Sequence, residues 1–288
     1  MKKLKQIISS IKADTVNTPD ELTNLLWGFI CYSPKMPVRF QQEQLLNKGE
    51  NFTLKVKDDF FAKRELNFNG FKWGKGKYKV LITHGWGSKA ADFYELISKL
   101  RQLKDLTIIA FDAPGNGSSE GELSNLLLFK DAVKTLIAEF GSPDILIGHS
   151  LGGMANIIAL SELGIEPALL ISISPLIRLK ENFEQSMASV GIATSAQQRF
   201  LESFTEKFNV PASQHNLIDG YRVNDKINHL LLYDKNDQIS TYDFLSEFLD
   251  NNPNIDARDF EDAGHERIIK TEQVIIGMIN AIKISAGI

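Results

Sequence analysis

The chain has 288 residues, of which 43% are hydrophobic, enough to bury one large core. Its formal net charge is −4, and no long run of residues carries a single sign. This balance argues against nucleic-acid binding, which requires a clustered basic surface to neutralise phosphates. The one cysteine, Cys31, excludes an intrachain disulfide, and its apolar helical neighbours predict a buried structural side chain.

The first residues are rich in lysine but never become the continuous apolar stretch of a signal peptide. No segment is as long and apolar as a membrane-spanning helix. The sequence therefore predicts a cytoplasmic protein; its oligomeric state stays open. Leu4, Ile7, Ile8 and Ile11 share one face of a helix flanked by lysines. This pattern favours a helix docked on the domain and leaves open contact with an anionic membrane surface.

Residues 1–48 are predicted to form a helical N-terminal extension. Thr18 and Glu21 have the spacing of a capping box, which predicts where its second helix begins. Pro34 and Pro37 predict its end, because proline cannot continue a helix.

From residue 52 onward, short apolar runs replace the helical pattern. The first two, separated by turn residues, predict an antiparallel pair. Strands and amphipathic helices then alternate, as in a mostly parallel sheet flanked by helices, so the fold class is α/β. The predicted strands are 52–56, 66–73, 80–82, 107–111, 145–147, 168–173, 229–233 and 255–260. The predicted helices are 89–103, 124–140, one starting near 151, 241–250 and 271–284.

The alternation breaks between about residues 176 and 226, where the sequence is helical and polar. A long insertion after a strand on the carboxyl side of a sheet is where a cap over an active site would lie. We therefore predict a core formed by residues 49–175 and 227–288, with a helical cap formed by residues 176–226.

The motif Gly148-His149-Ser150-Leu151-Gly152 follows an apolar strand and opens a helix. A serine nucleophile is held at such a sharp strand-to-helix turn, with its oxygen exposed. Glycines two residues to either side let the neighbouring backbone approach closely. This context predicts that Ser150 is a nucleophile.

The segment His84-Gly85-Trp86-Gly87 follows an earlier strand. Acyl transfer builds negative charge on a carbonyl oxygen, which two backbone N–H groups must stabilise. Leu151, directly after the nucleophile, is predicted to supply one of them, and Trp86 the other. The Trp86 side chain is also expected to wall the acyl pocket.

The nucleophile requires a histidine as general base, and the chain has five histidines. His84 and His149 belong to motifs already explained, His229 begins an apolar strand, and His215 lies in the predicted cap. His265 follows the last predicted strand, on a loop at the carboxyl edge of the sheet. This topology favours His265.

The triad acid is expected between nucleophile and base in chain order. The loop after strand 229–233 carries Asp234 and Asp237. Asp237 is favoured because it lies further into the loop, with reach toward His265, and Asp234 remains the competitor. Asp262 is too close to His265 in sequence to fold back onto it.

These motifs resemble the α/β-hydrolase superfamily over about residues 75–285. Residues 111–118 look like the family's D-x-P-G-x-G-x-S turn, which we expect to be structural. Two further stretches resemble a poorly characterised bacterial subgroup. They are Trp73-Gly74-Lys75-Gly76 and Gly264-His265-Glu266-Arg267-Ile268-Ile269.

The resemblance implies a serine esterase-like hydrolase without a cofactor, acting on a small to medium acyl ester or thioester. By this analogy Ser150 attacks the carbonyl, His265 takes and returns the proton, and Asp237 orients His265. Dehalogenases and epoxide hydrolases of this fold have an aspartate where this chain has serine. An amide or peptide hydrolase with the same triad is an alternative, as is a catalytically silent ligand-binding protein. The histidine spacing predicts no metal site, and no dinucleotide fingerprint is present.

Overall fold

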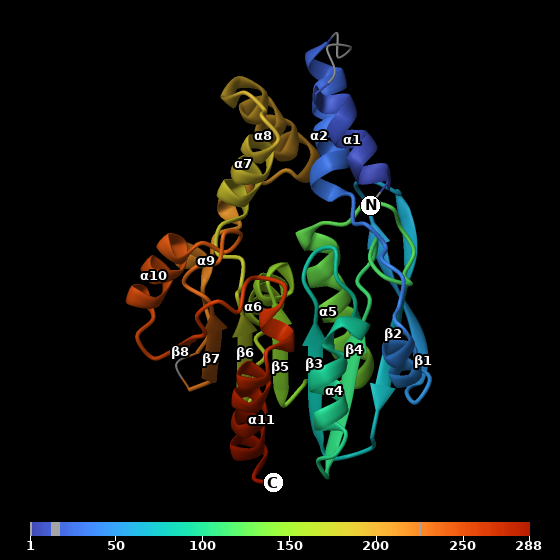
Figure 1. Cartoon of the computed structure of the whole chain (residues 1–288), viewed down its shortest axis with the longest axis vertical. Helices are drawn as coiled ribbons and strands as arrows, with labels where there is room; N and C mark the ends of the chain where they lie inside the picture. Colours follow the sequence, from blue (N-terminus) through green and yellow to red (C-terminus); the bar gives the residue numbers. More distant parts are fainter. Residues whose placement is uncertain (1, 13–17, 225) are drawn as a thin grey trace.

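The computed structural model describes residues 2–12, 18–224 and 226–288. Within these ranges an eight-stranded sheet has the order β1-β2-β4-β3-β5-β6-β7-β8 (Figure 1). β1 and β2 are antiparallel, as are β2 and β4, whereas all other neighbours are parallel. The strands are β1 (Glu50–Asp58), β2 (Arg64–Trp73), β3 (Tyr78–Thr83), β4 (Leu106–Phe111), β5 (Ile145–His149), β6 (Leu169–Ile173), β7 (Asn228–Tyr233) and β8 (Asp256–Asp259).

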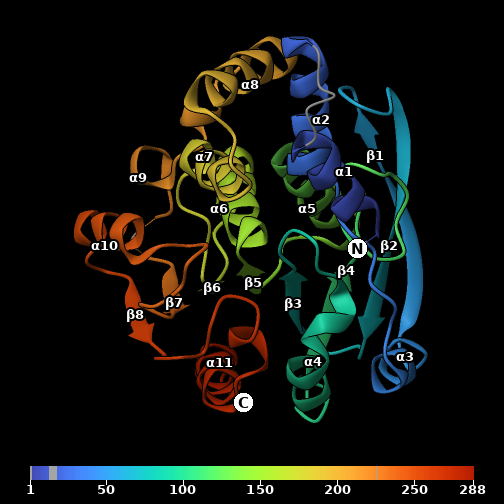
Figure 2. The same ribbon diagram turned by 45° about the horizontal axis from the view of Figure 1, so that its top comes forward.

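Helices cover both faces of the sheet (Figure 2). α5 (Leu126–Phe140) and α6 (Leu151–Leu163) pack in the core on one face. α4 (Tyr94–Leu100) and α11 (Glu272–Ala286) pack in the core on the other. α10 (Tyr242–Asn251) follows β7 at the edge of the sheet. The predicted α/β fold class, a mostly parallel sheet flanked by helices, is confirmed.

Each central strand is buried on both faces because successive side chains point in opposite directions. In β5, Leu146 joins the core under α5 and α6, while Ile145 and Ile147 join the core under α4 and α11. Burying such a side chain contributes about 1.5–3 kcal/mol relative to leaving it exposed. An unbroken apolar run is therefore stable as a central strand.

The helix predicted over residues 89–103 is shorter than expected. A 3₁₀ turn, Ala90–Phe93, leads into α4, which ends at Leu100. The N–H groups of Gln102 and Leu103 then donate to carbonyl groups three residues earlier, which tightens the chain. Asp105 next adopts a φ of +62°, which a helix cannot continue.

The N-terminal segment contains α1 (Lys2–Lys12), α2 (Pro19–Cys31) and α3 (Phe40–Leu46). The predicted capping box of α2 is confirmed, since Thr18 and Glu21 each bond the other's backbone N–H. α1 lies along α2 and buries Ile11 (Figure 1). No helix in the described part of the chain is long and apolar enough to cross a membrane.

Residues 176–226 include α7 (Leu179–Ser189), α8 (Thr194–Phe208) and the short α9 (Leu217–Gly220). α7 and α8 lie with α2 beyond the carboxyl ends of the central strands (Figures 1 and 2). α8 packs against α2 through Trp27, whose ring lies 4.8 Å from that of Phe200. The predicted helices are thus present. The division into extension, core and cap stays a prediction.

Candidate active site

Ser150 lies at the sharp turn between β5 and α6. Its backbone has φ +52° and ψ −122°, a strained combination for a residue with a side chain. A Cβ at Gly152 would lie 2.2 Å from the carbonyl oxygen of His84, and one at Gly148 would lie 2.7 Å from the Cα of Gly153. Only glycine fits at both positions, which explains the spacing of the motif.

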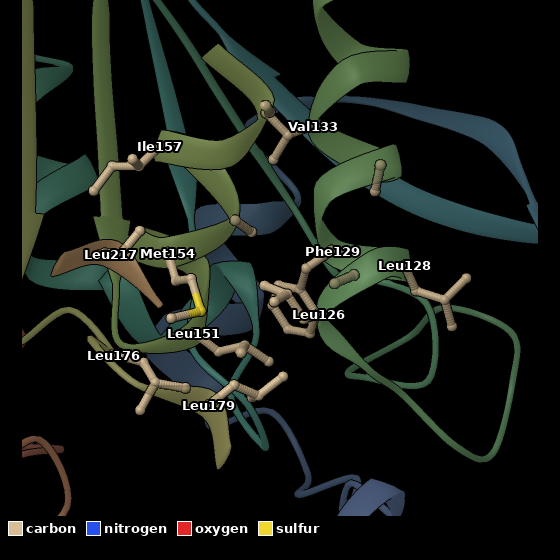
Figure 3. Packing of buried hydrophobic residues seen from close by; sticks show 14 of the residues in the cluster. Leu126, Leu128, Phe129, Val133, Leu151, Met154, Ile157, Leu176, Leu179 and Leu217 are labelled. Carbon is tan, nitrogen blue, oxygen red and sulfur yellow. The ribbon is translucent and has the colours of Figure 1, made fainter. Parts of the chain in front are cut away.

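Packing holds the start of α6 in place behind Ser150. Leu151 and Met154 of α6 are buried and face Leu126 and Phe129 of α5 (Figure 3). Leu176 also packs here, and its N–H donates to the carbonyl oxygen of Ser150 over 3.1 Å. The strained turn is therefore supported by a rigid core.

The structure brings Ser150, His265 and Asp237 together. Nε2 of His265 lies 2.9 Å from Oγ of Ser150, and Nδ1 lies 2.6 Å from Oδ2 of Asp237. An ionised carboxylate can only accept, so Nδ1 carries the proton and Nε2 is free to accept from the serine hydroxyl. The side chain of Asp237 is 1% exposed and that of His265 10%. The arrangement thus points a basic nitrogen at the serine hydroxyl.

The two competing aspartates occupy different positions. Oδ1 of Asp237 accepts from the N–H groups of Ile239 and Ser240, which leaves Oδ2 for His265. Asp234 makes no hydrogen bond to an imidazole among the described residues; it accepts from the N–H groups of Asn236 and Gly264. It therefore shapes the loop of Asp237 and holds the residue before His265.

Two opposing effects act on the pKa of Asp237. Burial raises it, because desolvation disfavours the charged carboxylate. The hydrogen bonds from His265 and from two backbone N–H groups lower it by more. The pKa consequently lies below its ordinary value, and the carboxylate is ionised at neutral pH.

The loop of His84-Gly85-Trp86-Gly87 lies directly beside the serine. Ser88 N–H donates to Gly85 O over 3.2 Å, closing a turn in which Gly87 has φ +72°. A Cβ at Gly85 would lie 3.0 Å from the Cβ of Ser150. Among the described residues, the N–H groups of Trp86 and Leu151 have no hydrogen-bond acceptor. Both predicted oxyanion donors are thus near Ser150 and free.

Asn116 fixes this loop, a function that sequence reasoning missed. Its Oδ1 accepts from Gly87 N–H over 3.1 Å and from the Ser33 hydroxyl over 2.5 Å. Asp112 adds a second link, since its Oδ1 accepts from Ala90 N–H over 2.8 Å. Asn116 and Asp112 belong to residues 111–118, the one signal in the sequence that could have pointed to them.

His84 and His149 are buried beside the site and support it. Nε2 of His84 accepts from Ala113 N–H over 2.9 Å, so its proton is on Nδ1, facing Gly85 O. Nε2 of His149 donates to the backbone oxygen of His265 over 2.8 Å. Burial, helped by the nearby charge of His265, lowers the pKa of His149 to about 3, so it is neutral.

The other candidates lie outside this cluster. His229 bonds the Tyr221 hydroxyl and the Ser172 hydroxyl, each over 2.8 Å, and burial lowers its pKa to about 3. His215 lies in the segment before α9 and lines the cavity described below. Cys31 is buried, as predicted, and burial raises the pKa of its thiol to about 12. Among the described residues, no group of His, Cys, Asp and Glu could hold a metal ion.

A cavity of about 850 Å³ opens onto Ser150 and His265. Much of its lining is apolar and comes from two parts of the chain: Phe183, Phe204 and Phe208 of α7 and α8, and Phe29 and Ile30 of α2. The contribution of the N-terminal segment was not anticipated. It depends on long-range packing of α2 on α8, for which the local sequence has no signal.

Residues 80–269 match the family model described as the alpha/beta hydrolase family, and the chain belongs to this family. Curated relatives match over shorter stretches. Monoglyceride lipase of Rattus norvegicus is 33% identical over 112 residues, covering 36% of this chain and 37% of that protein. A pimeloyl-[acyl-carrier protein] methyl ester esterase of Pectobacterium carotovorum is 27% identical over 137 residues, covering 47% and 50%. The alignments thus span half or less of these relatives.

Solved structures are similar over most of the chain. An esterase of Pyrococcus furiosus superposes with a TM-score of 0.59 at 18% identity, covering 88% of this chain and 96% of that one. Mouse alpha/beta hydrolase domain-containing protein 10 gives a TM-score of 0.61 at 18% identity, covering 81% and 97%. At this level of identity the likeness concerns the fold alone.

Proposed function

We propose that the protein is a serine hydrolase that cleaves carboxylic esters through an acyl-enzyme intermediate, with Ser150, His265 and Asp237 as the triad. The observation that carries this proposal is the continuous chain of short hydrogen bonds from the Asp237 carboxylate through His265 to the serine hydroxyl. Together with two free N–H groups beside the serine, it has the parts that acyl transfer needs.

In the proposed reaction Ser150 Oγ attacks the ester carbonyl carbon while His265 Nε2 takes its proton. The N–H groups of Leu151 and Trp86 stabilise the negative charge on the carbonyl oxygen. His265 then protonates the departing alcohol oxygen, leaving an acyl-serine ester. Water attacks this ester with His265 again as base, which releases the acid and restores the serine.

The cavity supports an ester with an apolar acyl chain. The proton goes to the departing oxygen from His265, so groups next to His265 meet the alcohol part of the substrate. The acyl chain then extends the other way, toward Phe183, Phe204 and Phe208. The volume and apolar lining suit a medium-length single chain. Acyl esters are also what the lipase and esterase relatives are named for.

Labelling with a fluorophosphonate tests the nucleophile. The serine oxygen displaces fluoride from phosphorus, and intact mass reports the adduct. We expect one label on the wild type and none on Ser150→Ala. Ser186→Ala is the matched control, because this serine lines the same cavity from α7. Hydrolysis of p-nitrophenyl octanoate should follow the same pattern.

Two results would contradict the proposal. A folded wild type that neither labels nor hydrolyses the ester would favour a ligand-binding protein. An octanoyl amide cleaved as fast as the matched ester would favour an amide hydrolase. An octanoyl thioester assayed alongside tells whether the proposed reaction extends to thioesters.

A further inference from the structure

Lys89 is a buried cation that faces the cavity without a hydrogen-bond acceptor. The residue is 6% exposed and lines the cavity a short distance along the chain from Trp86. In the described part of the chain its ammonium group makes one ion pair, with Asp92 at 3.4 Å, and no hydrogen bond. An ammonium has three N–H donors, and leaving them unpaired in a buried site is costly. The Lys89 ammonium can therefore donate hydrogen bonds to an acceptor that enters the cavity.

Asp92 is already occupied by other donors. It accepts from the Ser88 hydroxyl over 2.9 Å and from Gln42 Nε2 over 3.2 Å. Burial raises the pKa of Asp92. Lys89 and the other neighbours, Lys270 among them, lower this pKa by more, so the carboxylate stays ionised. This carboxylate holds Lys89 in place and is fixed by Gln42 of α3.

The charged side chains that line the cavity gather in this region. Three are cations and two are anions, an excess of one positive charge among the described residues: Arg39, Lys89, Lys270, Asp92 and Glu266. The cavity-lining phenylalanines Phe183, Phe204 and Phe208 form a separate cluster, in which neighbouring rings lie 4.5–5.6 Å apart. The cavity therefore has an apolar region, called the apolar end below, and a region that favours negative charge, called the charged end.

This charged end lies on the side of the alcohol part of the substrate. Glu266 directly follows His265, and Lys270 lies in the 3₁₀ turn Ile268–Lys270, which packs against Ala90–Phe93. The charged lining next to His265 thus includes Glu266 as well as Lys270 and Lys89, and it is Lys89 that is buried.

We propose that Lys89 binds an anionic oxygen group, a carboxylate or a phosphate, on the alcohol part of the ester. This inference rests on the proposed ester hydrolysis. It narrows the substrate class to a single-chain acyl ester whose alcohol part is anionic. The exposed Lys270 adds a second positive charge to the cavity lining, and Asp92 positions the Lys89 ammonium.

The experiment compares octanoyl esters that differ in the charge of the alcohol. The esters of glycolate and of glycerol 3-phosphate present a carboxylate and a phosphate, and the ester of glycolamide is neutral. We measure kcat/KM of the wild type, Lys89→Met and Lys89→Arg on each ester. The esters differ in intrinsic chemical reactivity. This difference cancels when the ratio of wild-type to variant kcat/KM is compared between esters. Lys99→Met is the control, because this half-buried lysine pairs with Glu272 and does not line the cavity.

We expect Lys89→Met to lower kcat/KM on at least one anionic ester by at least about tenfold more than on the glycolamide ester, the effect of one hydrogen bond to a charged group. Activity on the neutral ester shows that the variant is folded, and Lys89→Arg should keep most of the preference. Asp92→Asn removes the carboxylate that positions the Lys89 ammonium, so it should weaken the preference for the anionic ester, though by less than Lys89→Met does. The anionic ester that responds identifies carboxylate or phosphate as the group bound.

Equal losses on charged and neutral esters would overturn the assignment of Lys89 while leaving ester hydrolysis standing. A larger loss on the neutral ester than on either anionic ester would do the same. A folded wild type inert toward every ester, and unlabelled at Ser150, would instead refute the proposed function and this inference with it.

Discussion

Replacing Asp237 with asparagine should disable the proposed triad while preserving its shape. The substitution removes a negative charge about 4 Å from the imidazolium that forms when His265 takes the proton. At an effective dielectric constant of about 20, this charge pair contributes about 4 kcal/mol. Each ~1.4 kcal/mol of lost transition-state stabilisation slows the reaction tenfold, so we expect a rate about 10³-fold lower. Asparagine also donates as well as accepts, which allows the unproductive imidazole tautomer.

Asp234→Asn is the matched comparison in the same loop. It disturbs the hydrogen bonds to Asn236 and Gly264 but removes no charge in contact with His265. We therefore expect a loss of less than about tenfold, the cost of one weakened hydrogen bond. The assay is the second-order rate of fluorophosphonate labelling together with kcat for p-nitrophenyl octanoate. The assignment of the acid would be refuted if Asp237→Asn kept a rate within tenfold of the wild type while Asp234→Asn lost most of its activity.

Other consequences of the structure can be measured independently. Gly85→Ala should slow labelling at least about tenfold without unfolding the protein, because its Cβ would lie 2.9 Å from Nδ1 of His149; Gly277→Ala, where a Cβ meets nothing within 4 Å, should be neutral. Asn116→Ala removes the acceptor of the buried Ser33 hydroxyl and of the part-buried Gly87 N–H, and it should lower the free energy of unfolding, measured in urea, by about 2–4 kcal/mol. The folded pKa values of His149 and His229 are about 3, against about 6.5 in the unfolded chain. The unfolded state binds more protons between these values, so stability should fall by about 2 kcal/mol per histidine from pH 7.5 to 5. His229→Gln should reduce this fall in stability by about 2 kcal/mol; an unchanged pH dependence would contradict the assignment.

The strands and the candidate triad could be predicted because their signals are local. An apolar run such as Ile145–Ile147 is stable only between two covering layers, so it indicates a central parallel strand. Parallel strands end at one edge of the sheet, which is why Ser150 and His265, 115 residues apart, could be placed together. The choice between Asp234 and Asp237 was harder. It depends on which carboxylate the loop conformation turns toward the imidazole, and this conformation cannot be read directly from the sequence.

Features built from distant segments were not predictable in the same way. Asn116 bonds Ser33, 83 residues away, and Gly87, 29 residues away. Neither hydrogen bond produces a periodic pattern in the sequence from which it could be predicted. The same holds for Lys89, whose burial depends on α3 packing on Ala90–Phe93. The sequence likewise predicts one helix over residues 89–103, because the tightening turns after Leu100 consist of residues that helices also accept.

The N-terminal segment connects the two ends of the cavity, which the sequence had separated into an extension and a cap. α2 packs on α8 beside the apolar end. Ser33, two residues after α2, donates to Asn116, which in turn accepts from Gly87 in the loop His84–Gly87. Gln42 of α3 then bonds Asp92 at the charged end. One continuous stretch of chain thus contacts the acyl wall, the oxyanion loop and the partner of Lys89. A displacement of α2 would therefore alter the cavity and the catalytic loop together, because both depend on the same short segment.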